Sequence, residues 1–251
     1  MVLRQADESV VEVSRSEARS RIVLVCEHAS SHIPENLHDL GISLAARRSH
    51  VAWDPGAMAV AQRLSQDLDA VLVASTVSRL VYDCNRPPEA PDAIPTHNEA
   101  YDVPGNVGLT DQEKRARVAR YYTPFRERLT SEIAGRTDPV IVTVHSFTPI
   151  YNGEKRDVEI GVLHDRDSLL ADAVMRVADS HDVRRNAPYG PEDGVTHTLK
   201  EHAVNLGHLN VMIEVRNDLI ADEAGQAVMA KTLAGWITRA LETLGVDACK
   251  A

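Results

Sequence analysis

The run Ile22-Val-Leu-Val-Cys26 is the feature that most restricts how this chain can fold. Consecutive apolar and mostly β-branched residues are typical of a strand buried on both faces, as found in parallel sheets covered by helices. The run stops at Glu27 and His28, and Pro34 then prevents any continuation of the strand. Ligands bind open α/β sheets just outside the carboxyl ends of the strands, so Glu27 and His28 stand where a functional site is expected.

Two further apolar runs end in the same way. A strand over 139–145 ends at His145, and Ser146 follows it. A strand over 209–215 carries Glu214 near its end. Two imidazoles and a carboxylate at comparable strand ends predict one shared site centred on a metal ion.

The segments between these runs carry mostly helical patterns. Helices are predicted over 56–68, from the capping box Thr110–Glu113 to about Ala134, and over 168–180, 192–203 and 223–244. Shorter strands are predicted at 71–74, 79–82, 158–163 (near a sheet edge) and 183–185, with residues 1–20 as an arm or an edge strand. This alternation predicts a doubly wound, mostly parallel sheet with helices on both faces, in a single domain over 1–251.

Composition excludes several classes of protein. A hydrophobic content of 43% and a charged content of 25% are those of a soluble globular protein, and a net charge of −10 argues against binding nucleic acid or an anionic membrane. Cys26, Cys84 and Cys249 form neither a disulfide framework nor a metal knuckle, which favours a reducing cytoplasm. The chain shows no signal-peptide layout and no apolar run of about 18 residues. The oligomeric state stays open.

The candidate metal ligands are imidazole nitrogens and a carboxylate, the usual donors to a catalytic zinc. His28 and His145 supply the imidazoles. Asp54 is the candidate for the acidic ligand, and Glu27, adjacent to His28, is its rival. Asp54 also precedes Pro55 at a predicted helix start, so it could instead be only a helix N-cap.

Glu214 is the candidate general base, because a carboxylate beside a metal can take a proton from water. The alternative is an ion pair with Arg216, since residues i and i+2 of a strand face the same way.

The segment from Arg79 to Pro88 is the other dense cluster of polar residues. Arg86 offers a planar fork suited to a substrate carboxylate, Asn85 a neutral donor beside it, and Arg79 or Asp83 could position them. The alternative is a plain turn after a strand in which Asp83 pairs with Arg79.

The sequence resembles the N-formylglutamate amidohydrolases over about residues 21–240. The segments that carry the resemblance occur in the family's order: Val25–Pro34, Trp53-Asp54, Arg79–Pro87, Val144-His-Ser146, Asp157–Gly161 and Ile213-Glu-Val-Arg216. The resemblance implies a three-layer α/β/α sandwich like that of zinc-dependent carboxypeptidases and aspartoacylases. It also implies one zinc on His28, Asp54 and His145, Glu214 as the group that activates water, and Asn85 and Arg86 as the grip on a substrate carboxylate.

The leading hypothesis is therefore a zinc-dependent amidohydrolase acting on a small N-acyl amino acid, with N-formyl-L-glutamate as the first candidate. Arg216 or Arg79 would hold a second carboxylate or stabilise the oxyanion, and the Pro-rich stretch 87–108 would cover the pocket. The alternative is a non-catalytic module that binds carboxylates or peptides. A serine hydrolase built on Ser146 is disfavoured, because Gly-x-Ser-x-Gly is missing and adjacent strand residues point to opposite faces.

Overall fold

The computed structural model describes residues 9–248. Within them, seven strands form one sheet in the order β1-β3-β2-β6-β11-β9-β10. Their bounds are β1 Val11–Ser14, β2 Ile22–Cys26, β3 Val71–Ser75, β6 Val140–Phe147, β9 Ile160–Leu163, β10 Val183–Arg185 and β11 Leu209–Arg216. Two small ribbons stand apart from this sheet, β4 His97–Asn98 with β5 Tyr101–Asp102, and β7 Ile150–Tyr151 with β8 Glu154–Lys155.

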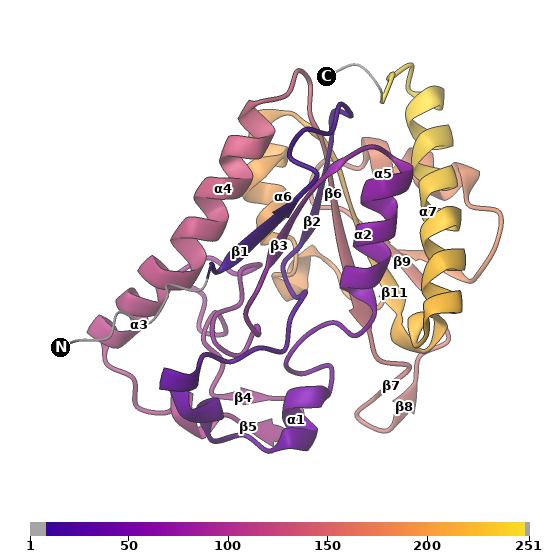
Figure 1. Cartoon of the computed structure of the whole chain (residues 1–251). Coiled ribbons are helices and arrows are strands. Elements are labelled where there is room, and N and C mark those ends of the chain that lie inside the picture. Colours follow the sequence, from indigo (N-terminus) through magenta and orange to yellow (C-terminus); the bar gives the residue numbers. More distant parts are fainter. Residues whose placement is uncertain (1–8, 249–251) are drawn as a thin grey trace.

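The sheet is mostly parallel. Strands β3, β2, β6 and β11 pair in parallel, whereas β1 runs antiparallel to β3, and β9 antiparallel to β11. The carboxyl ends of β2, β6 and β11 therefore meet at one edge of the sheet, the lower edge in Figure 1. This confirms the predicted mixed, mostly parallel sheet.

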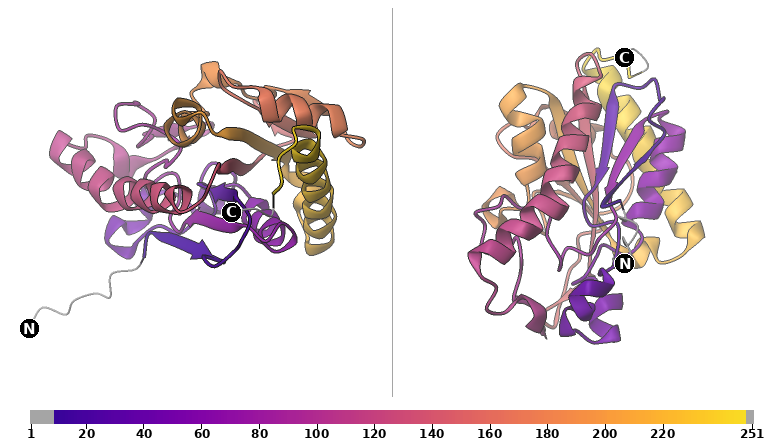
Figure 2. Two further views of the ribbon diagram at one scale, coloured as in Figure 1. Left: turned by 90° about the horizontal axis from the view of Figure 1, so that it is seen from above. Right: turned by 60° about the vertical axis from the view of Figure 1, so that its left-hand side comes forward.

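Helices cover both faces of the sheet and make a three-layer α/β/α sandwich (Figure 2). One face carries α2 Ala57–Asp67, α5 Leu169–Val177 and α7 Glu223–Thr243. The other carries α4 Thr123–Ala134 and α6 His197–His202. The remaining helical segments are α1 Leu44–Arg48, α3 Asp111–Arg117, the π-helical turn η3 Val118–Tyr122, and the 3-10 turns η1 Glu35–Gly41, η2 Pro104–Asn106, η4 Pro191–Asp193, η5 Val204–Leu206 and η6 Asn217–Ile220.

Both faces of the central strands are buried. In β2, Leu24 belongs to the apolar core under α2 and α7, whereas Val23 and Val25 belong to the core under α4. Trp236 of α7 and Phe125 of α4 are among the largest fully buried side chains of the two cores. Burial from two sides explains why β2 is a continuous apolar run rather than an alternating one.

The structure corrects three predicted elements. Residues 79–82 form a turn and not a strand, because the Ser78 hydroxyl accepts from Leu80 N and the Ser78 carbonyl accepts from Val81 N. The predicted helix over 192–203 is divided into η4 and α6, since Gly194 takes a left-handed φ of 71°. Strand β9 does not lie at the sheet edge, because β10 pairs with its outer side.

In the part of the N-terminal segment that the structure describes, β1 is an edge strand paired with β3. Residues 1–8 and Cys249 lie outside the described residues. None of the helices within 9–248 combines the length and the apolarity that crossing a membrane requires.

Candidate metal centre and surrounding cleft

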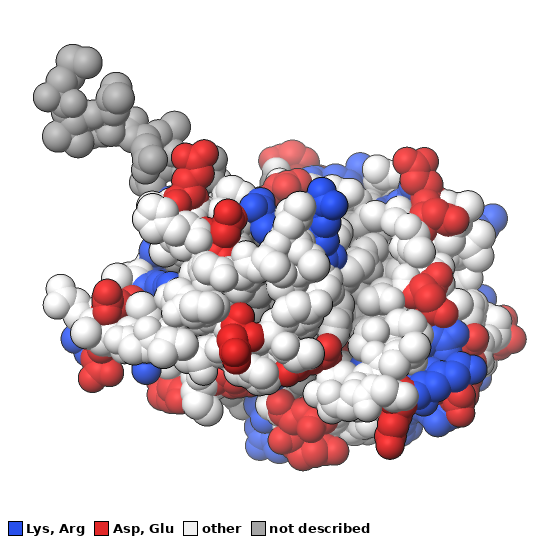
Figure 3. Space-filling view, turned by 90° about the horizontal axis from the view of Figure 1, so that it is seen from below, with Lys and Arg blue, Asp and Glu red and all other residues white. Residues whose placement is uncertain are grey.

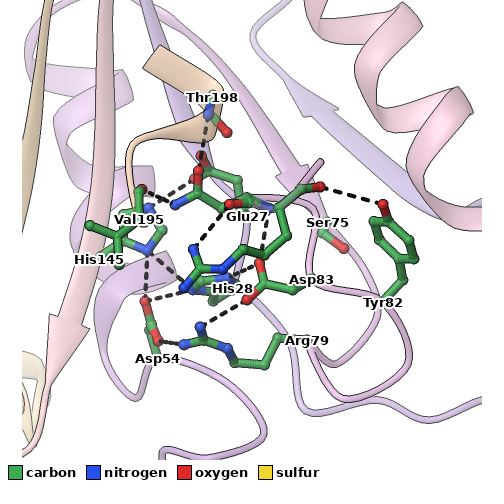
Figure 4. Close-up of polar contacts among 12 residues, drawn as sticks. Glu27, His28, Asp54, Ser75, Arg79, Tyr82, Asp83, His145, Val195 and Thr198 are labelled. Carbon is green, nitrogen blue, oxygen red and sulfur yellow. Dashed lines mark hydrogen bonds and ion pairs between the residues drawn. The ribbon is translucent and has the colours of Figure 1, made fainter. Parts of the chain in front are cut away.

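Three buried side chains from distant segments converge at the lower edge of the sheet: His28 just after β2, His145 in β6, and Asp54 in the turn before α2 (Figure 4). Asp54 Oδ2 lies 2.9 Å from His145 Nδ1 and 3.3 Å from His28 Nδ1. The two Nδ1 atoms are 3.2 Å apart. The backbone N–H of Asp54 donates to the His28 carbonyl at 2.9 Å, which fastens the turn to the end of β2.

This group fits a divalent cation. One ligand atom from each of its three residues lies within 4.8 Å of the other two. Tetrahedral zinc with ligands at about 2.0–2.1 Å needs donor atoms roughly 3.3 Å apart, close to the separations found here. Two imidazole nitrogens and one carboxylate oxygen are also a common donor set of catalytic zinc sites.

Asp54 does not cap a helix. Helix α2 begins at Ala57 after Gly56, which has a φ of 83°, and no side chain caps this terminus. The Asp54 carboxylate instead accepts from the Ser146 backbone N–H at 3.2 Å and faces the two imidazoles. The capping alternative is therefore wrong, and the geometry favours Asp54 as the acid of the group.

Two further carboxylates contact the imidazole rings at their Nε2 atoms, on the side away from Asp54. Asp83 Oδ1 lies 2.7 Å from His28 Nε2, and Glu27 Oε2 lies 3.1 Å from His145 Nε2. The hydrogen bond to Asp83 fixes the proton of His28 on Nε2 and leaves its Nδ1 free to bind a metal. Glu27 makes a close charge contact with His145 Nε2 that lacks hydrogen-bond geometry. Glu27 thus contacts the side of the His145 ring that faces away from Asp54, and it does not join the three-residue group.

The acids of this network are held ionised. Burial alone would raise the pKa of Asp54, but the charges of His28 and His145 and their hydrogen bonds lower this pKa well below its ordinary value. The pKa of Asp83 is likewise lowered against the effect of burial, by His28 and Arg79. Arg79 Nη2 lies 2.8 Å from Asp83, and Arg79 Nη1 lies 3.6 Å from Asp54. The network therefore suits a central positive charge.

Glu214 lies beside this group. It pairs in register with His145 across β6 and β11, is 5% exposed, and lines the same cleft. Its Oε2 atom has no hydrogen-bond partner among the residues that the structure describes. Burial raises the pKa of Glu214 to about 7. A carboxyl group with this pKa can exchange a proton at neutral pH.

The cleft has a volume of about 260 Å³. Its walls come from segments far apart in the sequence: His50 after α1, Asn98 and Glu99 around β4, Tyr151 of β7, and Tyr189 before η4. Because Asn98 and Glu99 belong to the stretch 87–108, the predicted covering loop does contribute to the cleft. Figure 3 views the molecule from the side to which β2 and β6 point; basic and acidic side chains lie interspersed around this face, and its centre is mostly uncharged.

Asn85 and Arg86 line the cleft and also hold one of its walls. Asn85 Nδ2 donates to the Val195 carbonyl at 2.5 Å, and Asn85 Oδ1 accepts from Thr198 N at 3.0 Å. Arg86 Nε donates to Asp92 at 2.7 Å, and Arg86 Nη1 donates to the carbonyl at 194, at 2.9 Å. The pair therefore fastens the segment before α6 to the end of the 79–86 turn.

The other two candidate arginines differ in position. Arg79 lines the cleft, whereas Arg216 is not among the lining residues. Arg216 Nε donates to Asp218 at 2.8 Å, and its Nη1 donates to the Asp157 carbonyl at 3.0 Å. These contacts direct Arg216 away from Glu214 and replace the ion pair considered as the alternative role of Glu214.

Ser146 lacks the contact that a serine nucleophile requires. Its hydroxyl donates to the Pro55 carbonyl at 2.9 Å, while the ring of His145 is engaged by Asp54 and Glu27. The geometry gives no Ser–His pair.

Several residues that form the walls of the cleft were not identified from the sequence. His50, Glu99, Tyr151 and Tyr189 occupy loops or a two-residue strand, with no strand-end position and no recognisable spacing. No sequence signal marks them, because only the packing of remote loops brings them to the cleft.

The fold and the site together define a class of protein: a mixed α/β protein with histidine and carboxylate side chains gathered at the carboxyl ends of its sheet. The sequence profile of the N-formylglutamate amidohydrolases matches residues 20–221. The chain belongs to the N-formylglutamate amidohydrolase family, whose members are hydrolases that act on amides.

Two solved structures are similar to this one. A gene product of Agrobacterium tumefaciens is 53% identical in sequence, with a TM-score of 0.93 over 96% of this chain and 98% of that one. The N-formylglutamate amidohydrolase of Ralstonia eutropha JMP134 is 20% identical, with a TM-score of 0.67 over 94% of this chain and 98% of that one, and it shows a shared fold. No match was found among curated protein sequences.

Asp83→Asn is expected to weaken metal binding by about 10–100-fold, because the amide no longer offers His28 Nε2 a negative partner. Metal affinity measured by competition with a chelator checks this result. Asp102→Asn, which changes an exposed acid on β5, is the control and should leave the affinity unchanged. Equal affinities in the wild type and Asp83→Asn would contradict an orienting role for Asp83.

Gly161→Ala is expected to destabilise the fold by about 1–3 kcal/mol, the usual cost of overpacking. A Cβ at position 161 would lie 2.2 Å from the Ala187 carbonyl oxygen and 3.2 Å from Glu214 Cβ. Denaturant unfolding measures the change, with Gly108→Ala as a comparison whose Cβ would meet open space. Since Gly108 has a φ of 73°, that variant carries only backbone strain.

Proposed function

We propose that the protein is a zinc-dependent amidohydrolase that hydrolyses the amide of a small N-acyl amino acid, with N-formyl-L-glutamate, giving L-glutamate and formate, as the first candidate. One zinc ion per chain would be held by His28, Asp54 and His145. The observation that carries the proposal is Glu214, which lies in the same cleft as that group and whose Oε2 atom has no hydrogen-bond partner among the described residues. The chain would act as one amidohydrolase domain, since the three residues of the group gather at one edge of the single large sheet within residues 9–248.

A bound zinc ion would act as a Lewis acid, polarising the acyl carbonyl and making water easier to deprotonate. Glu214 would accept the proton of the attacking water and deliver it to the leaving amine, for which a pKa of about 7 is well suited. Asp83 would keep the His28 imidazole in the orientation that leaves Nδ1 free, and the charge of Glu27 would favour the same orientation of the His145 ring.

The substrate would be held by its carboxylate at the Asn85–Arg86 corner. Each of these side chains keeps N–H groups beyond those used to fasten the segment before α6, and both face the cleft. Arg79, whose positive charge lies next to Asp54, would stabilise the developing oxyanion. We assign Arg216 no substrate contact, because its donors are engaged outside the cleft.

Metal analysis and an activity screen test the proposal. Purified protein should contain about one zinc per chain. The zinc-loaded protein should release formate or acetate from N-formyl or N-acetyl acidic amino acids, and a chelator should abolish this activity. A folded protein that contains no stoichiometric metal and binds carboxylates equally well with a chelator would instead support the non-catalytic binding module.

A further inference from the structure

The guanidinium of Arg117 is buried against the turn that carries Asp83. Arg117 is the last residue of α3, and it is 7% exposed. Its Nη1 donates to the Val81 carbonyl at 3.1 Å and to Asn106 Oδ1 at 2.6 Å. Its acceptors are all neutral oxygens, and within residues 9–248 no Asp or Glu forms an ion pair with it. The charge of Arg117 is thus directed at the backbone and amide oxygens of two other segments.

Asn106 extends this contact to the neighbouring carbonyl group of the turn. It belongs to η2 and is 2% exposed. Its Nδ2 donates to the Leu80 carbonyl at 2.9 Å and to the Pro95 carbonyl at 2.7 Å. Leu80 and Val81 are buried outside any helix or strand, where a carbonyl without a donor costs free energy. Arg117 and Asn106 therefore supply donors to two consecutive carbonyls of the turn.

The residues on either side of these two carbonyls act on the candidate metal centre. Arg79 precedes Leu80, and its Nη2 lies 2.8 Å from Asp83. Asp83 comes two residues after Val81, and its Oδ1 lies 2.7 Å from His28 Nε2. Because this segment is a turn, no ladder of sheet hydrogen bonds fixes it. A displacement of about 1 Å at Asp83 would take its contact with His28 beyond hydrogen-bond distance.

The helix that carries Arg117 widens directly after it into the π-helical turn η3. There the Thr123 N–H donates to the Val118 carbonyl, five residues back. The ring of Tyr122, in η3, is buried, and its centroid lies 5.3 Å from that of Tyr82, a residue of the 79–86 turn. Single π turns within α-helices are frequent at functional sites. The same helix therefore contacts the 79–86 turn through a ring as well as through Arg117.

We propose that Arg117, together with Asn106, is a positioning residue that holds the 79–86 turn where Asp83 reaches His28 Nε2, and so sets the affinity of the candidate metal centre for zinc. This inference rests on the proposed zinc-dependent function. An arginine suits the role because its rigid planar fork can donate to two segments at once. Fold stability alone is a poor reason for such a residue, since an apolar side chain would avoid the cost of burying the charge.

Zinc affinity measures this role through a double-mutant cycle. Arg117→Met should lower the affinity by about 10-fold, the lower end of the range for a lost orienting partner. In the Asp83→Asn protein the same change should have little further effect, because the contact through which Arg117 acts is already lost. Arg117→Lys keeps a charged donor and should retain part of the affinity. Each affinity is measured by competition with a chelator for zinc.

Two further variants separate positioning from folding. Asn106→Ala removes one side-chain donor to the turn and leaves Arg117 in place, so it should repeat the non-additive loss with Asp83→Asn even where Arg117→Met folds poorly. Arg128→Met is the matched control, because Arg128 is exposed on α4 and paired with Glu132. It should leave the zinc affinity unchanged. Denaturant unfolding of the metal-free proteins establishes which variants are folded.

Two results would overturn the inference. One is a folded Arg117→Met protein with the zinc affinity of the wild type. The other is an equal loss of affinity in the wild-type and Asp83→Asn backgrounds, which would make Arg117 a general support of the fold. Non-additive zinc affinities in a protein that hydrolyses no N-acyl amino acid would keep this inference and reject the proposed function. Additive affinities in an active zinc enzyme would do the reverse.

Discussion

Replacing Glu214 by Gln should lower kcat by about 10²–10⁴-fold while the zinc stays bound, the range found when a general base is lost. Gln keeps the shape of the side chain but cannot accept a proton. Glu214 is the group in the cleft with a free carboxylate oxygen among the described residues and with a pKa that burial raises to about 7. The three residues that would hold zinc are untouched by this change.

The measurement is steady-state hydrolysis together with metal analysis of the same preparation. Glu132→Gln is the matched control, because Glu132 lies on α4, where it pairs with Arg128 and Arg136. It should keep both activity and metal. A Glu214→Gln protein that retained near-native kcat with full zinc would remove Glu214 from the reaction and require another base.

The same variant should change how stability depends on pH in the metal-free protein. The pKa of Glu214 is raised from 4.5 to about 7 on folding, so between these values the folded state binds more protons than the unfolded state. The free energy of unfolding of the wild type should therefore fall as pH rises from 4.5 to about 7. Glu214→Gln lacks this contribution and should be more stable than the wild type by up to about 3 kcal/mol above that window, as measured by denaturant unfolding.

Asp54→Asn should abolish stoichiometric metal binding and lower activity by at least about 10³-fold, because losing an outer carboxylate alone costs about 10–100-fold in affinity. Asp54 supplies the only acid of the three-residue group and lies within 3.3 Å of both imidazoles. The amide also leaves the charge of Arg79 less compensated at this buried position.

Metal content after dialysis, activity and thermal unfolding measure these effects. Asp67→Asn is the control, since Asp67 is an exposed acid at the end of α2. The loss of metal should abolish the stabilisation that added zinc gives the wild type, which mass action sets at about 2.7 kcal/mol when zinc is present at 100 times its Kd. Full zinc and full activity in Asp54→Asn would return Glu27 to consideration as the acidic ligand.

The sequence alone determined the framework on which the site is built. The apolar runs of β2, β6 and β11 identify strands that are buried on both faces. This hydrophobic pattern is a local property of each segment, so it can be recognised without knowing the rest of the fold. His28 and His145 follow from it, because the carboxyl ends of parallel strands meet at one edge. Glu214 follows as well, since it lies opposite His145 when β6 and β11 pair.

Only the tertiary structure decided what the loops do. The local sequence pattern allows Asp54 to be either a helix cap or a metal ligand. Which role it takes depends on whether the segment that carries Asp54, 26 residues after His28, folds back against His28. The contacts of Asp83 and Glu27 with the imidazoles, the turn at 79–82 and the hydrogen bonds of Arg117 are likewise set by contacts between segments remote in sequence. Strand periodicity reports on burial within one element, whereas the pairing of polar groups from different loops depends on distances that exist only after the sheet and its helices have packed.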